Sequence, residues 1–156
     1  MAATVTRAEL EALIGQQLGV SEWFLIDQER VNAFADVTLD HQFVHVDVER
    51  ARATPFGGTI AHGFLTLSLL VSLCLPFIPT LADRRLLVNY GFDKVRFAAP
   101  VRVGKRIRAV GKLAEIAERK PGNVILRIDV TVEIEGEDKP ALVAEWLSLH
   151  VVGTPS

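Results

Sequence analysis

The sequence predicts a single α+β domain in which a curved antiparallel sheet wraps around one apolar helix. Residues from Arg84 onward alternate between apolar and polar side chains, which is the period of strands with one solvated face. Residues 59–75 form a long apolar run ahead of them, large enough to cover the dry face of such a sheet. With 156 residues, 49% of them hydrophobic, the chain suits one compact domain, and we expect residues 1–156 to form it.

The first elements are short and carry start signals. Thr6 and Glu9 have the spacing of a capping box, which predicts a helix from about Arg7 to Ile14. Residues 22–26 are apolar and aromatic, so we expect a first strand there.

A second helix is expected to start after Asp27, a favoured N-cap residue, and to stop before Asp40. Its apolar stripe consists of Val31, Phe34 and Ala35. Residues 38–58 are polar and contain proline and glycine, which predicts an irregular loop with one short helix near residues 48–53. Asp47 suits the N-cap of that short helix.

The apolar helix is predicted over residues 59–75. It is hydrophobic almost all round, so we expect other parts of the protein to enclose it on nearly every side. His62, Gly63 and two following prolines cut the apolar run below the roughly 20 residues that cross a bilayer. Cys74 is the only cysteine, which excludes an intramolecular disulfide, and its apolar neighbours indicate a buried side chain.

The clearest strand covers residues 124–134. Its alternate side chains are apolar and point to one face: Val124, Leu126, Ile128, Val130, Val132 and Ile134. Turn residues at 120–123 and 135–140 separate it from strands expected at 106–113 and 141–152. Strands joined by such short turns are antiparallel neighbours in the sheet.

The charge balance excludes a general attraction to polyanions. Lys and Arg number 17 and Asp and Glu 19, which gives a net charge of −2. We therefore expect neither nucleic acid nor a membrane as a partner. The first seven residues lack the basic and apolar segments of a secretory signal, so we expect a cytoplasmic location.

Titratable side chains gather where the loop meets the apolar helix. Asp40 and His45 lie five residues apart, and each can exchange a proton near neutral pH when its surroundings allow. Gly63 lies near the start of the helix, where free backbone N–H groups suit an oxygen that gains negative charge. The spacing alone is a weak signal, because a loop-stabilising carboxylate and a surface imidazole would produce it too.

The residues around these positions resemble a known family. Residues 40–47 read DHQFVHVD and residues 59–66 read TIAHGFLT, and both segments are similar in order and spacing to the MaoC-like dehydratases. This family is the (R)-specific enoyl-CoA hydratase, or hydratase 2, group. The similarity runs roughly over residues 23–152 and includes residues 95–104.

The resemblance implies a hotdog fold, usually dimeric, with acyl-thioester sites near the subunit interface. It implies syn hydration of trans-2-enoyl-CoA to (R)-3-hydroxyacyl-CoA, and the reverse, with the coenzyme A thioester as substrate and no cofactor. At the matching positions Asp40 and His45 activate the water, and the backbone N–H of Gly63 faces the thioester oxygen. We assign substrate binding to Gly63, His62 and Gln42, with a local packing or bonding role for the His62 imidazole.

The chain departs from the usual motif at Gln42 and Phe43, where the family commonly has Asn-Pro. Gln42 is therefore expected to supply the polar contacts of the loop, while Phe43 and Phe56 line the pocket. We expect His41 to be solvated and His150 to lie in a strand. A metal site is not expected, because no recognised ligand spacing joins His41, His45, Asp47 and His62.

Two other functions compete with hydration. A hotdog thioesterase would bind the same ligands but direct water at the carbonyl carbon, and an acyl-CoA binding module would have the fold without the chemistry. Several basic side chains are candidates for coenzyme A phosphate contacts, although they also suit the wet face of a sheet. They are Arg84, Arg85, Lys94, Arg96, Arg102, Lys105 and Arg106.

Overall fold

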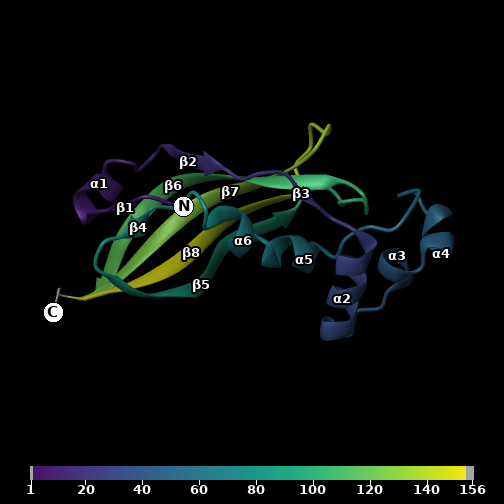
Figure 1. Cartoon of the computed structure of the whole chain (residues 1–156), viewed down its shortest axis with the longest axis horizontal. Coiled ribbons are helices and arrows are strands. Elements are labelled where there is room, and N and C mark those ends of the chain that lie inside the picture. The colour runs from purple at the N-terminus through teal and green to yellow at the C-terminus, as the bar shows by residue number, and fades with distance from the viewer. Residues whose placement is uncertain (1, 154–156) are drawn as a thin grey trace.

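A computed structural model describes residues 2–153 of the chain (Figure 1). Six strands form one antiparallel sheet in the order β2-β6-β7-β8-β5, with β3 also paired to β6. These strands are β2 (Gln17–Val20), β3 (Phe24–Leu25), β5 (Arg84–Phe97), β6 (Arg106–Lys120), β7 (Asn123–Ile134) and β8 (Leu142–Val152). A separate parallel pair consists of β1 (Thr4–Val5) and β4 (Thr80–Leu81). The helices are α1 (Arg7–Glu11), α2 (Gln28–Thr38), α3 (Phe43–Val46), α4 (Val48–Arg52), α5 (Gly63–Ser68) and α6 (Leu70–Cys74).

Every second side chain of β7 lies on the dry face of the sheet, as the alternation of apolar and polar residues predicted. The apolar series from Val124 to Ile134 is buried, whereas Asp129 on the other face is exposed. Ile128 lies opposite Leu113 of β6 and Trp146 of β8, both in antiparallel register. The helices α5 and α6 run along this face (Figure 1). Their buried side chains include Leu65, Leu70, Leu73 and Cys74.

The central helix differs from its prediction in start, continuity and enclosure. It begins at Gly63 and is interrupted at Leu69. Residues 59–61 are extended instead of helical, because they pair with residues 101–103 through two backbone hydrogen bonds of 2.8 and 2.9 Å. Phe64 is 66% exposed, so the helix is not enclosed on nearly every side. No helix among residues 2–153 is long and apolar enough to cross a membrane.

The helices α2, α3 and α4 gather beyond one end of the sheet (Figure 1). The carboxylate of Asp27 accepts a hydrogen bond from the N–H of Arg30 at 2.8 Å, and that of Asp47 accepts from the N–H of Arg50 at 3.0 Å. Both predicted caps, and the predicted short helix after Asp47, are therefore confirmed. The helix α3 is a correction, because the sequence predicted irregular loop over its residues.

At the opposite end of the sheet, α1 starts with the predicted capping box (Figure 1). The Glu9 carboxylate accepts from the N–H of Thr6 at 2.7 Å, and the Thr6 hydroxyl accepts from the N–H of Glu9 at 3.3 Å. The helix ends at Glu11, earlier than predicted. The chain then turns through Gly15, which has φ 84° and donates its N–H to the carbonyl of Leu113 at 2.7 Å.

The strand β2 was not predicted, and two glycines explain how it packs. Gly19 of β2 lies opposite Gly111 of β6. Phe77 lies over this pair, since a Cβ added to either glycine would come within 2.6 Å of a Phe77 side-chain atom. The two glycines therefore form a slot for one aromatic ring, a feature that apolar alternation cannot signal.

Candidate active site

The short helix α3 carries His45 inward from the loop, where only 8% of the residue is exposed. Its Nδ1 lies 2.7 Å from the carbonyl oxygen of Ile60. Because a carbonyl only accepts, Nδ1 carries the proton, and Nε2 keeps its lone pair in the neutral ring. Burial lowers the pKa of His45 below its ordinary value, which favours this neutral form. His45 therefore offers the site a basic nitrogen.

Asp40 follows α2 at a sharp turn of the chain. The helix α2 ends at Thr38, and the next residue, Leu39, has a φ of 62°, which places this non-glycine residue in the left-handed region. The backbone carbonyl of Asp40 accepts a hydrogen bond from Nε2 of His62 at 2.9 Å. Asp40 itself is exposed, and its carboxylate also accepts a hydrogen bond from the N–H of Gln42 at 3.4 Å.

His62 connects the loop to the central helix. It directly precedes α5 and is 2% exposed. Since Nε2 donates to the Asp40 carbonyl, Nδ1 is an acceptor in the neutral ring, and it is buried with no partner among the described residues. The ring stacks on that of His45, with centroids 3.8 Å apart and planes 26° apart. The predicted local role of His62 thus includes direct contact with both proposed catalytic residues.

Asp40, His45 and His62 lie together in one cluster of titratable side chains. One nitrogen or oxygen from each lies within 4.8 Å of the others. Nε2 of His45 and the carboxylate oxygens of Asp40 can each accept a hydrogen bond, so the cluster suits a water that donates one hydrogen bond to each. The same atoms are potential metal ligands.

A cavity of about 300 Å³ adjoins this cluster and is mainly apolar. Its lining consists of His45, Ile60, Ala61, Gly63, Thr66, Phe97, Ala98, Ala99, Pro100, Val101 and Ala141. Phe43 and Phe56, which the sequence assigned to the pocket, are not part of this lining. Phe43 packs instead against the guanidinium of Arg50, 4.2 Å from its ring centroid. The aromatic wall of the cavity is Phe97.

Sequence reasoning missed Phe97 and Thr66 as residues of the site. Phe97 ends β5, and the sequence connects its segment to the site only through the family resemblance. Thr66 is buried one turn into the central helix and lines the cavity. A threonine directly after the Gly63 turn was the signal available in the sequence.

Gly63 is the first residue of α5, where backbone N–H groups have no acceptor within the helix. A Cβ at this position would lie 3.0 Å from the Phe97 ring, so glycine also allows that ring to close over the helix start. Gln42 corrects a prediction, because its exposed side chain makes no hydrogen bond among the described residues. Its backbone serves the loop instead, with the carbonyl accepting from the N–H of His45 at 2.9 Å.

The other histidines lie outside this cluster, as predicted. His41 is exposed and lies 2.9 Å from the carboxylate of Asp36. His150 lies in β8 and is fully buried, with Nε2 3.2 Å from the Ser148 hydroxyl.

The family can now be assigned from comparison with known proteins. Residues 9–134 match the family model described as MaoC like domain. The chain belongs to the MaoC-like family. This MaoC-like chain is 50% identical over 144 residues to a 3-hydroxyacyl-thioester dehydratase Z from Mycobacterium tuberculosis, covering 92% of this chain and 95% of the relative. It is 47% identical over 146 residues to Nodulation protein N from Rhizobium meliloti, covering 93% and 91% respectively.

A solved structure supports the same assignment. The (R)-hydratase from A. caviae involved in PHA biosynthesis has a TM-score of 0.69 at 25% identity, covering 86% of the MaoC-like chain and 94% of the hydratase. The predicted α+β hotdog fold is therefore confirmed. Its central helix is present as the two consecutive segments α5 and α6.

Proposed function

We propose that this MaoC-like chain adds water reversibly to a trans-2-enoyl-CoA and forms the (R)-3-hydroxyacyl-CoA. The observation that carries the proposal is the cluster of Asp40, His45 and His62 beside the cavity that Gly63 lines. The names of the relatives, a 3-hydroxyacyl-thioester dehydratase and an (R)-hydratase, support this chemistry. The name Nodulation protein N specifies no reaction.

The proposed reaction needs one water between Asp40 and His45. The water donates one hydrogen bond to the Asp40 carboxylate and one to Nε2 of His45, and its oxygen attacks C3 of the enoyl group while a proton passes to the pair. Electron density moves to the thioester oxygen, which the N–H of Gly63 stabilises. A proton returned to the α-carbon on the same face completes syn addition of one water and restores the enzyme.

The surroundings of His45 suit this role. Burial lowers its pKa, so Nε2 is unprotonated at neutral pH and can accept the proton of water. The Ile60 carbonyl fixes the tautomer and the ring orientation through Nδ1. His62 in turn holds the backbone of Asp40 beside the ring.

One assay separates hydration from the two competing functions. The protein is incubated with crotonyl-CoA, the enoyl absorbance and the free thiol are followed together, and the product is resolved by chiral chromatography. We expect loss of the absorbance without thiol release and a product of (R) configuration. Thiol release would indicate a thioesterase instead, and binding without either change would indicate a non-catalytic acyl-CoA module.

We also propose that the chain acts as a homodimer through β5. This strand lies at one edge of the described sheet. Its exposed apolar side chains are Leu86, Val88, Tyr90, Phe92 and Phe97. Phe97 lines the cavity beside His45 and Gly63, which we call the catalytic cavity. It meets the exposed Phe64 ring edge to face, with centroids 5.7 Å apart. A long edge with apolar side chains favours pairing, so a second copy here would cover the side of the cavity next to Phe97.

Light scattering tests this assembly. We expect a mass twice the 17.1 kDa of the chain, and Leu86→Glu is expected to shift the protein towards monomer and to lower its activity. A monomeric wild-type protein with full activity would contradict the proposed dimer.

A further inference from the structure

A second cavity, of about 530 Å³, is lined by three cationic side chains. They are Arg52, Arg102 and Lys105, and no carboxylate belongs to the lining. Gln28, Gly57 and Thr59 also line this basic cavity. A concave surface with charge of one sign attracts ligands of the opposite sign, so the basic cavity favours an anion.

Two paired backbone segments separate the basic cavity from the catalytic cavity. They are residues 59–61 and 101–103. Ile60, Ala61 and Val101 line the catalytic cavity, whereas Thr59, Arg102 and Val103 line the basic cavity. The two cavities are therefore neighbours that share one wall.

Gln28 links the basic cavity to the catalytic histidine. Its Nε2 donates to the backbone carbonyl of His45 at 2.7 Å, and its Oε1 accepts from the Thr59 hydroxyl at 2.6 Å. A residue of the basic cavity thus contacts the same short helix that orients His45.

Arg102 is the cation available to such a ligand. Arg52 lies 2.8 Å from Glu49 and Lys105 lies 3.3 Å from Glu137, whereas Arg102 has no carboxylate partner among residues 2–153. The Arg102 guanidinium lies across Gly57, where a Cβ would come within 2.7 Å of Nη2. Gly57, with φ 68°, therefore provides both the turn and the space for this side chain.

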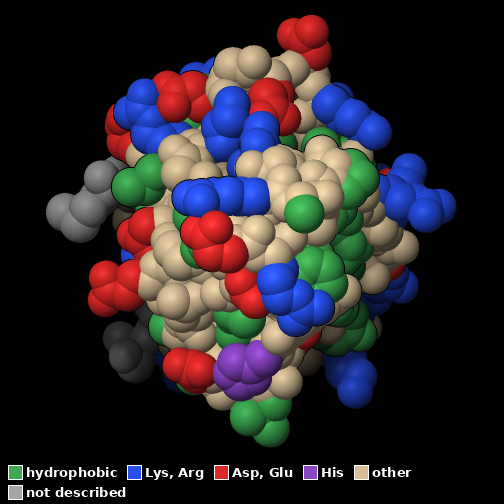
Figure 2. Space-filling view, turned by 90° about the vertical axis from the view of Figure 1, so that its right-hand side faces the viewer, with side chains coloured by type: hydrophobic (Ala, Val, Ile, Leu, Met, Phe, Trp, Pro, Cys, Tyr) green, Lys and Arg blue, Asp and Glu red, His purple; other side chains and the backbone are tan. Residues whose placement is uncertain are grey.

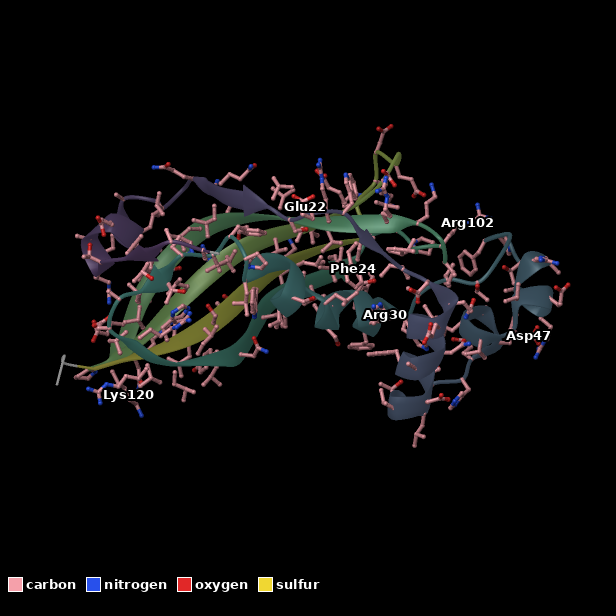
Figure 3. All side chains as sticks on the ribbon, in the orientation of Figure 1. Glu22, Phe24, Arg30, Asp47, Arg102 and Lys120 are labelled. Atoms are coloured by element: carbon pink, nitrogen blue, oxygen red, sulfur yellow. The ribbon has the colours of Figure 1, made fainter. Side chains whose placement is uncertain are left out.

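The figures place Arg102 at the end of the sheet that faces the helices α2, α3 and α4. In Figure 3 it extends from the loop after β5 on the same side of the molecule as Asp47. Figure 2 looks onto this end and shows several Lys and Arg side chains spread over it. Arg84 and Arg85, by contrast, begin β5 at the opposite end, and Arg106 is paired with Glu135.

We propose that the basic cavity binds the phosphate groups of the coenzyme A part of the substrate. This inference rests on the proposed hydration of a coenzyme A thioester. Coenzyme A carries its phosphates beyond a long pantetheine arm, away from the acyl group, which matches a basic cavity next to the catalytic cavity. Arg102 donates two hydrogen bonds from its planar guanidinium to a phosphate, and Arg52 and Lys105 add positive charge.

Substrates with and without phosphates test this inference. Crotonyl-pantetheine has the reacting group and the arm of crotonyl-CoA but lacks its phosphates. We expect wild-type protein to prefer crotonyl-CoA in kcat/KM, and Arg102→Ala to reduce that preference about tenfold, the loss of one charge-assisted contact. Arg119→Ala is the matched control, because Arg119 is an exposed arginine near the end of β6 and does not line the basic cavity.

Binding of adenosine 3′,5′-bisphosphate provides a second readout that does not depend on catalysis. Calorimetry is expected to show binding to wild-type protein and to Arg119→Ala, with about tenfold weaker binding to Arg102→Ala. Equal substrate preference and equal binding in all three proteins would overturn the phosphate assignment. Failure of wild-type protein to hydrate either thioester, with bisphosphate binding intact, would overturn the proposed reaction while leaving the anion site.

Discussion

The imidazole rings of His45 and His62 stack with their centroids 3.8 Å apart, and each ring is bonded to a different backbone carbonyl. The His45 ring donates to Ile60 and the His62 ring donates to Asp40. These two bonds leave one lone pair on each neutral ring. The stack therefore brings together the loop, the extended segment before α5 and the start of the helix.

Removal of either proposed water-activating group should abolish hydration without unfolding the protein. Asp40→Asn and His45→Gln are each expected to lower kcat by about 10²- to 10⁴-fold, the usual contribution of general acid–base catalysis. Steady-state kinetics with crotonyl-CoA measure the loss, and circular dichroism checks the fold. Near-normal turnover in either variant would contradict the proposed mechanism.

His62→Phe tests whether His62 positions the catalytic pair. Phenylalanine can retain the stack but loses the hydrogen bond to Asp40, so we expect kcat/KM to fall about tenfold. Burial is the main cause of the lowered pKa of His45, and His62 lowers that pKa further, so the loss of His62 should raise it. His45 must be neutral to accept a proton. We therefore expect the acid-side loss of activity to occur at a higher pH in His62→Phe than in the wild type. The pH profile of kcat/KM measures this shift.

The exposed His41 offers a control for this experiment. His41→Phe also removes a histidine near the loop, but His41 lies outside the cluster of Asp40, His45 and His62. The acid limb of the pH profile of kcat/KM should be the same for His41→Phe as for the wild type. An unchanged acid limb in His62→Phe would show that His62 has a purely structural role.

His150 should make the stability of the fold sensitive to acid. Burial, aided by the positive charge of Arg84, lowers its pKa to about 4. Between pH 6.5 and 4 the unfolded chain binds a proton that the folded chain does not, so stability falls through this range, by on the order of 3 kcal/mol. Above pH 6.5 both states are neutral and the effect vanishes.

Chemical denaturation at several pH values checks this contribution. His150→Leu should remove this part of the acid sensitivity, whereas Ser148→Ala should retain it because the histidine stays buried. Parallel loss of stability in the wild type and His150→Leu down to pH 4 would argue against the shifted pKa.

Gly111→Ala should destabilise the fold. A Cβ at Gly111 would lie 2.6 Å from the Phe77 ring, so the ring must leave its slot, at a cost of about 1–3 kcal/mol. Gly58→Ala is the control, because a Cβ there meets nothing within 4 Å. Urea denaturation should separate the two variants clearly. Equal stability would mean that Phe77 repacks without cost.

The sequence alone determined the features that depend on local periodicity and local caps. Alternation placed the buried face of β7, and the side chains of Asp27 and Asp47 marked two helix starts. The motif around Asp40 and His45 identified the correct family, because residue order within one segment is visible without a fold. Their role in hydration stays a prediction.

The tertiary structure decided the features that depend on pairing between distant segments. Residues 59–61 are apolar enough for a helix but pair with residues 101–103, because an extended partner satisfies their backbone hydrogen bonds there. That pairing sets the helix start at Gly63. The same pairing places Arg102 in the lining of the basic cavity. Contacts across about 40 residues depend on where the chain returns in space, which no local period encodes.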